Sequence, residues 1–129
     1  MKNIPYATTY FPPAPIAEVH LAVPDESTKL GPFTALIDTG ADGTFVATSL
    51  LEELDAPIVY MTNVRPHLGT HRQRAAVYKI DLLLAPDFRM VGIEVVGDDW
   101  GQGVILGRNV LNKLNVLLNG RKQTTTITE

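Results

Sequence analysis

Short apolar and alternating runs, separated by turn residues, predict a chain built mainly of β-strands. Residues 17–23 alternate, with Val19 and Leu21 on one face and Glu18 and His20 on the other, as in a strand with one buried face. Similar runs predict further strands at 33–37, 44–47, 58–64, 77–84, 88–96, 104–106, 116–118 and 124–128. This many strands within 129 residues indicates a single all-β domain.

Turn residues join some of these runs into hairpins. The turn signals are Pro24-Asp25-Glu26-Ser27-Thr28, Pro86-Asp87, Gly97-Asp98-Asp99-Trp100-Gly101 and Asn119-Gly120. Asn-Gly is a strong hairpin signal because both residues adopt positive φ readily. We expect Trp100 to pack against the core rather than to line a pocket.

Two short helices interrupt the strands. Ser49 and Glu52 have the spacing of a capping box, which predicts a short helix after Ala47 that ends before Pro57. A second helix is predicted at 109–114, near the C-terminus. Both are too short to change the all-β class.

Two segments stand apart from the predicted sheet. The prolines of Pro12-Pro13-Ala14-Pro15 exclude a central strand or a helix, so residues 1–14 are interpreted as an N-terminal arm before a domain of residues 15–129. Residues 65–75 are polar, carry one glycine and lie between two strand runs, which predicts a projecting hairpin. Its arginines and histidines suit acidic substrates or, alternatively, keep a solvated hairpin from pairing at its edges.

Composition narrows the classes of function. Hydrophobic residues make up 45% of the chain and charged residues 19%, as in globular proteins, and a net charge of −3 gives no electrostatic case for nucleic acid. No apolar run approaches the ~20 residues of a membrane span, and the N-terminus lacks the apolar core of a signal peptide. We therefore expect a cytoplasmic protein that binds no membrane. There is no cysteine, the histidines are scattered and Asp98-Asp99 has no patterned third ligand, so we expect no metal site.

One stretch carries specific chemistry. The apolar run Ala35-Leu36-Ile37 leads straight into Asp38-Thr39-Gly40, which is how a buried strand delivers a carboxylate to a tight turn. Near the C-terminus, Val104-Ile105-Leu106 leads in the same way into Gly107-Arg108-Asn109 and a predicted helix. The other aspartates start no second Asp-Thr-Gly.

Together these two stretches resemble the retropepsin family, the single-domain aspartic proteases of retroviral type, and most of all the cellular domains of the DNA-damage-inducible proteins. The resemblance covers about residues 15–128. It implies a symmetric homodimer in which Asp38 of each copy faces one water, so that peptide bonds are hydrolysed without a metal or cofactor. Because the chain has a single Asp-Thr-Gly, one copy holds half of such a site.

The family pattern implies roles for further residues. Asp38 is the implied catalytic residue, Thr39 interlocks with the partner's Thr39, and Gly40 accepts substrate backbone hydrogen bonds. Asp42 meets the substrate main chain and pairs with Arg108, or forms a plain structural ion pair. The implied substrate-binding positions are Ala41, Asp42, Phe45, Gly103 and Ile105 around the side-chain pockets, and Leu68, Gly69 and Thr70 at the tip of a flap.

Two departures from the viral pattern bear on the dimer. Viral enzymes place an arginine before the proline that opens the first strand, whereas Ala14 precedes Pro15 here. The chain also continues past the last viral strand with the Asn119-Gly120 hairpin. We expect the dimer interface to use that hairpin, with Leu117 and Leu118 as its apolar contacts.

Three functional hypotheses follow. The first is a homodimeric aspartic endopeptidase acting on extended or unfolded polypeptide. The second is a catalytically weak or inactive retropepsin-fold dimer that binds peptide or acts as a scaffold, and the third is an unrelated β domain that binds a small ligand. The intact Asp38-Thr39-Gly40 favours the first, because a binding module has no need of that carboxylate. Retroviral-type proteases often cut between an aromatic residue and proline, so Phe11-Pro12 is either a self-processing site or part of an ordinary arm.

Overall fold

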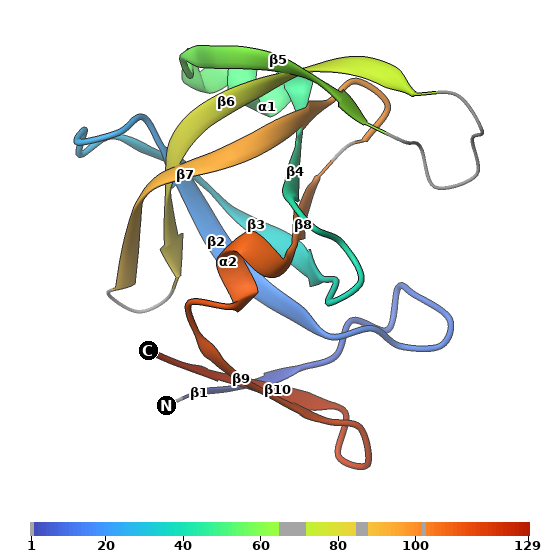
Figure 1. Ribbon diagram of the computed structural model, residues 1–129. Helices are drawn as coiled ribbons and strands as arrows, with labels where there is room; N and C mark the ends of the chain where they lie inside the picture. The colour runs from blue at the N-terminus through green and yellow to red at the C-terminus, as the bar shows by residue number, and fades with distance from the viewer. Residues whose placement is uncertain (1, 65–71, 85–87, 102) are drawn as a thin grey trace.

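The computed structural model describes residues 2–64, 72–84, 88–101 and 103–129 of the chain. Strands dominate these residues, which confirms the all-β prediction. The strands are β1 (Lys2–Pro5), β2 (Ile16–Ala22), β3 (Lys29–Ile37), β4 (Thr44–Ala47), β5 (Ile58–Val64), β6 (Gln73–Leu84), β7 (Phe88–Asp98), β8 (Val104–Leu106), β9 (Asn115–Asn119) and β10 (Thr124–Thr128). The described residues also form two short helices, α1 (Thr48–Leu54) and α2 (Arg108–Leu111) (Figure 1).

The larger sheet closes into a barrel. Neighbouring strands follow the order β2-β3-β8-β4-β7-β6, and β2 pairs again with β6, so the sheet returns to its first strand. Closure pairs the backbone groups that an open sheet leaves unpaired at its edges. β5 extends the sheet from β6, and its other edge has no strand partner among the described residues (Figure 1).

Pairing with β8 brings distant parts of the sequence to one end of the barrel. β3 runs parallel to β8, with Ile37 opposite Leu106. β4 lies antiparallel on the other side of β8, with Phe45 opposite Ile105. Because β3 and β8 point the same way, the segment after β3 and Gly107 after β8 arrive at the same place.

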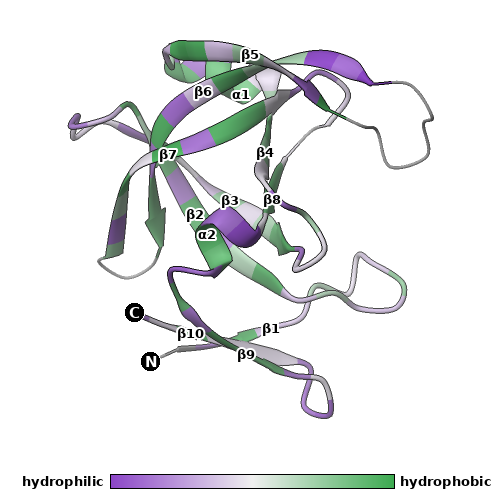
Figure 2. Cartoon of the chain, viewed as in Figure 1, coloured by the Kyte–Doolittle hydropathy of each residue, from purple (hydrophilic) through white to green (hydrophobic). Residues whose placement is uncertain are grey.

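Alternating apolar residues from the barrel strands form the core. Val19 and Leu21 are fully buried, as the alternation of β2 predicts, and they belong to one buried cluster with Leu82 and Leu106. Figure 2 shows the hydrophobic positions in green along the barrel strands. Burying each such leucine stabilises the fold by about 2 kcal/mol. The register of the strands around Asp38 is therefore fixed by the core beneath them.

A separate three-stranded sheet holds both ends of the described chain. Its order is β1-β10-β9, so the first strand pairs with the last, with Lys2 opposite Ile127 (Figure 1). Ile4, Val116 and Ile127 pack toward the core. Leu117, which alternates to the other face, is 62% exposed. The start of the predicted N-terminal arm is thus an edge strand of this sheet.

The first helix lies where it was predicted, after Ala47 and before Pro57, whereas its cap and the bounds of the second helix differ from the prediction. α1 begins at Thr48, so Ser49 lies inside its first turn, and the capping-box prediction is wrong because no side chain caps this helix. The backbone leaves α1 through Asp55, which has a φ of 60°. α2 ends at Leu111, and the rest of the predicted 109–114 helix continues as tighter turns. Neither helix of the described chain is long and apolar enough to cross a bilayer.

The loop before β8 also differs from the prediction. Gly97 and Asp98 still belong to β7, which pairs with β4 there, so the loop starts after Asp98. Trp100 is 85% exposed, so the prediction that it packs against the core is wrong. The predicted Pro86-Asp87 turn lies outside the described residues, but β6 and β7 pair antiparallel on either side of it, as a hairpin requires.

Candidate active site

Asp38 is delivered by β3 into a tight turn. Its N–H donates to the carbonyl of Leu106 (3.0 Å), which ties the end of β3 to the end of β8. Its carbonyl accepts from the N–H of Ala41 (3.2 Å), and its carboxylate Oδ1 accepts from the N–H of Gly40 (2.9 Å). The backbone of the turn therefore orients the carboxylate, while Asp38 stays half-exposed.

Two glycines allow the backbone to approach this closely. A Cβ on Gly40 would lie 3.2 Å from Asp38 Oδ1. A Cβ on Gly107 would lie 2.0 Å from the carbonyl oxygen of Gly43 and 3.0 Å from that of Ala41. Because both of these obstacles are backbone atoms, no change of side-chain rotamer relieves the overlap. Gly107 thus lets the end of β8 support the Asp38 turn directly.

A hydrogen-bond network centred on the buried Thr44 joins β4 to α2. The hydroxyl of Thr44, which is fully buried, donates to Asn109 Oδ1 (2.7 Å) and accepts from the N–H of Gly107 (3.1 Å). Asn109 Nδ2 in turn donates to the carbonyl of Glu94 (3.0 Å). A satisfied network of this kind favours one arrangement of the turn. No local pattern predicts this network, because its partners are far apart along the chain.

Arg108 braces the outer side of the turn. Its guanidinium donates to the carbonyl of Thr39 (2.8 Å) and pairs with the carboxylate of Asp42. Its backbone N–H donates to the carbonyl of Ala41 (2.8 Å). The expected ion pair is therefore present, but the Asp42 side chain is 93% exposed, so the pair adds less than about 1 kcal/mol to stability. Its main effect is to hold the turn in place.

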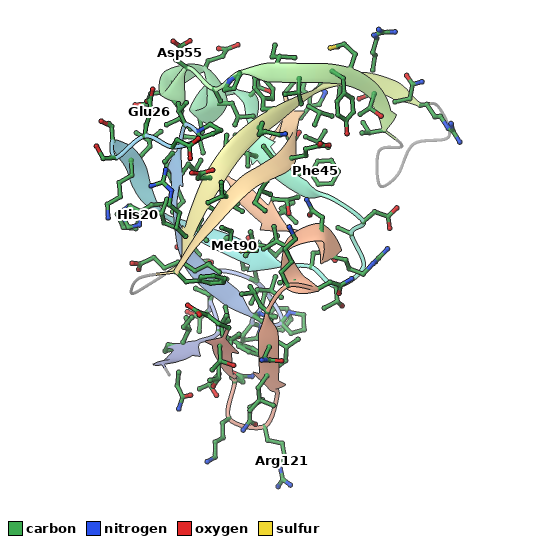
Figure 3. The ribbon with its side chains drawn as sticks, turned by 60° about the vertical axis from the view of Figure 1, so that its left-hand side comes forward. His20, Glu26, Phe45, Asp55, Met90 and Arg121 are labelled. Carbon is green, nitrogen blue, oxygen red and sulfur yellow. The ribbon has the colours of Figure 1, made fainter. Side chains whose placement is uncertain are left out.

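Half-buried apolar side chains share a face of the sheet with Asp38. Leu36 lies two residues before Asp38 and opposite Ile105, and Ile105 lies opposite Phe45. These three side chains, named here the apolar strip, are half-buried, whereas Ile37 between Leu36 and Asp38 is buried in the core. In Figure 3 the Phe45 side chain lies below β5. The prediction did not single out Leu36, although strand alternation ending at Asp38 was a signal for it.

The other predicted substrate positions are placed only in part. Ala41 is half-buried in the turn, and Gly103 is exposed just before β8. The predicted flap tip, Leu68-Gly69-Thr70, lies outside the described residues. The flanking strands β5 and β6 pair antiparallel up to Val64 opposite Gln73, so they form the two arms of a hairpin.

The residues predicted to contact a second copy lie in two places. Thr39 is exposed in the turn, whereas Leu117 and Leu118 are 62% and 40% exposed in β9, on the three-stranded sheet. Across the described ranges, no group of three or more histidine, aspartate or glutamate side chains is placed to hold a metal ion. Asp38 supplies a carboxylate to the turn. A half-exposed carboxylate beside apolar side chains can take a proton from water or share one with a second carboxylate.

Known proteins resemble this chain in structure rather than in sequence. No model of a known protein family matches it, and no curated protein matches it in sequence. A retropepsin-like aspartic protease from Rickettsia conorii matches with a TM-score of 0.63 at 13% identity, over 99% of this chain and 92% of its own. The chain has a retropepsin-like fold.

Two further structures with this fold match as well. The Simian foamy virus (mac) protease has a TM-score of 0.52 at 20% identity, over 75% of this chain and 91% of its own. The retroviral protease-like domain of Ddi1 from Leishmania major has a TM-score of 0.52 at 14% identity, over 88% of this chain and 89% of its own. These structural matches confirm the resemblance to retropepsin-like proteins that the sequence indicated, including the domains of the DNA-damage-inducible type. At these sequence identities the matches show the fold alone, so any catalytic role depends on Asp38 and its surroundings.

Proposed function

We propose that this chain is a homodimeric aspartic endopeptidase in which Asp38 from two copies activates one water. The observation that carries the proposal is the setting of Asp38: a half-exposed carboxylate, oriented by the N–H of Gly40 and adjoining the apolar strip. The retropepsin-like fold supports the proposal at the level of the protease family.

The reaction explains why two copies are needed. Two carboxylates about 3 Å apart cannot both ionise, so the pair holds one proton between them. The ionised member takes a proton from water as a general base, and the protonated member polarises the scissile carbonyl. Because this chain has a single Asp-Thr-Gly, a twofold axis has to supply the second carboxylate.

The substrate in this proposal is an extended polypeptide that adds a strand beside the apolar strip. Leu36, Phe45 and Ile105 then favour apolar side chains next to the cut, while Gly40 and Asp42 contact the main chain. In this proposal Leu68, Gly69 and Thr70, which lie outside the described residues, contact the substrate.

The three-stranded sheet is the proposed contact between copies, together with Thr39. Leu117 and Leu118 are exposed there on opposite faces of β9, and a second sheet covering the Leu117 face removes that apolar surface from water. Leu117→Lys should therefore yield monomers at micromolar concentration and lower the activity in parallel, as sedimentation and cleavage measured on one sample will show. Val91→Lys, at a 60% exposed position on β7, is the matched control. A Leu117→Lys protein that remains dimeric refutes this interface.

The test of catalysis is a peptide library analysed by mass spectrometry. Asp38→Asn should lower cleavage by about 10³-fold or more, because the amide cannot act as a general base. Asp55→Asn is the matched control, since this exposed residue has a φ of 60°, which asparagine also adopts. Cleavage that survives Asp38→Asn overturns the proposal. Peptide binding without any cleavage by the unaltered protein would instead favour the peptide-binding dimer.

A further inference from the structure

Trp100 points outward from the loop between β7 and β8. It is 85% exposed, and it is the single tryptophan of the chain. An indole contributes most when its large apolar surface is buried, so leaving it in water forgoes that stabilisation. Tryptophan is also strongly enriched among the residues that dominate binding energy at interfaces. An outward tryptophan is therefore a candidate contact for a ligand.

Two side-chain hydrogen bonds brace the segment that leads into Trp100. Asp98 Oδ1 accepts from the N–H of Trp100 itself (3.1 Å), and Asp99 Oδ1 accepts from the hydroxyl of Thr48 (2.6 Å). A Cβ on Gly101 would lie 2.3 Å from Asp98 Oδ2, so the chain passes close to the Asp98 carboxylate, and a larger residue there would require the Asp98 side chain to move. A braced loop loses less conformational entropy when a ligand binds.

β8 connects this loop directly to the Asp38 turn. At the loop end, the carbonyl of Gly103 accepts from the N–H of Ala47 (2.9 Å). At the turn end, the carbonyl of Leu106 accepts from the N–H of Asp38 (3.0 Å). The steps from Gly103 to Leu106 span about 10 Å along a strand, and an extended peptide covers the same distance in three or four residues.

We propose that Trp100 binds an apolar side chain of the substrate, three or four residues from the scissile bond. This inference rests on the proposed peptidase function and adds a specificity determinant to it. The apolar strip accommodates the residues next to the cut, and Trp100 extends the apolar surface outward along β8. In a twofold dimer each copy presents one such side chain, so the preference applies on both sides of the cut.

Trp100 reports on its own surroundings, because all tryptophan fluorescence of the chain comes from it. The test uses Asp38→Asn protein, which leaves peptides uncut, and octapeptides with either leucine or serine at both ends. Binding is followed independently by the anisotropy of labelled peptide. Leucine-ended peptides should shift the emission to shorter wavelength and reduce quenching by acrylamide, whereas serine-ended peptides should not. Unchanged emission at saturation overturns the inference. An emission shift that depends on protein concentration alone also overturns the inference, because it would place Trp100 in the contact between copies.

Kinetics separate this inference from the proposed function. Trp100→Ala should lower kcat/KM for leucine-ended peptides by about 10-fold, mainly through KM, and leave serine-ended peptides unchanged. Trp100→Phe should keep most of the preference, and Val91→Ala, at a 60% exposed position on β7, should change neither. Equal cleavage by the Trp100→Ala and unaltered proteins refutes the inference and leaves the peptidase standing. An emission shift on peptide binding, combined with no cleavage of any peptide by the unaltered protein, supports the binding role and refutes the peptidase.

Discussion

Asp38 and Asp81 are two carboxylates with opposite surroundings. Asp81, within β6, is fully buried and accepts from Arg89 Nε (2.8 Å), from the N–H of Gly92 (2.8 Å) and from the N–H of Asp25 (3.2 Å). Asp38, at the end of β3, is half-exposed, and its carboxylate accepts from one backbone N–H in the described structure. The Asp81 carboxylate is surrounded by hydrogen-bond donors, whereas the Asp38 carboxylate can accept further hydrogen bonds.

This difference distinguishes a structural carboxylate from one that is available for chemistry. Burial raises the pKa of Asp81, but the N–H of Gly92, the Arg89 guanidinium and the N–H of Asp25 outweigh it and hold that pKa below its ordinary value. Arg89 also donates to the carbonyl of Glu26 (2.7 Å), so the pair fastens the turn after β2 onto the barrel. Asp81 links the turn after β2 to β6 and β7, whereas the Asp38 carboxylate is oriented by its own turn and remains partly exposed to solvent.

Replacing each carboxylate by its amide should separate the two roles. Asp38→Asn should lower peptide cleavage by about 10³-fold or more but change the free energy of unfolding by less than about 0.5 kcal/mol. Asp81→Asn should cost about 3 kcal/mol of stability, because it leaves the Arg89 charge without its partner, and should keep kcat/KM per folded molecule unchanged. Urea unfolding and cleavage assays on the same preparations measure both effects. A large loss of stability in Asp38→Asn would contradict the comparison.

The pH dependence of stability should follow Asp81. Because its folded-state pKa is lowered, its contribution is fully present above the unfolded-state value and is lost as the pH falls through the folded-state value. We therefore expect the free energy of unfolding to fall below about pH 4, and Asp81→Asn to flatten this fall. Urea titrations between about pH 6 and pH 3 measure the slope. Equal slopes with and without Asp81 would show that other groups control acid unfolding.

A smaller effect tests how far the Asp38 turn depends on its support. Gly107→Ala places a methyl group against the backbone of Gly43, and we expect a loss of about 2 kcal/mol. Activity should fall further than stability alone explains, because the turn carries Asp38. Gly120→Ala is the matched control, since a Cβ there meets nothing within 4 Å. The free energy of unfolding and the rate of cleavage are measured for both variants. Equal values for Gly107→Ala and Gly120→Ala would contradict the expected support.

Local patterns predicted most of the strands, and partners distant in sequence explain the errors. The bounds of β4, β5, β8 and β10 agree with the prediction, because alternation and turn residues are local signals. β3 begins at Lys29 rather than at 33, since pairing with β2 extends it. The hydroxyl of Thr48 bonds Asp99, from a loop far along the chain, and the capping box predicted at Ser49 does not form. β1 pairs with β10, which a proline-rich segment does not reveal.

The residues of the candidate site also fall into those that the sequence predicts and those that only the tertiary structure reveals. Asp38 with its following turn could be predicted, because a short motif carries it, and the Asp42–Arg108 pair was implied by the resemblance to the retropepsin family. Thr44 and Asn109 could not, because only the register of β4, β8 and α2 brings them together. Trp100 was misjudged because an apolar residue usually packs inward, and the bond between Thr48 and Asp99 that holds its loop joins residues distant in sequence.

The pairing of β1 with β10 has a practical consequence. Since Lys2 lies opposite Ile127, an affinity tag or dye fused to either terminus occupies the sheet proposed to join two copies, and it will disturb their association. A circular permutant avoids this: a short linker bridges the neighbouring ends, and the chain is opened at the exposed residues Ser27 and Thr28, between β2 and β3 of the larger sheet. Labels placed at the new ends leave the first and last strands fused within one fold.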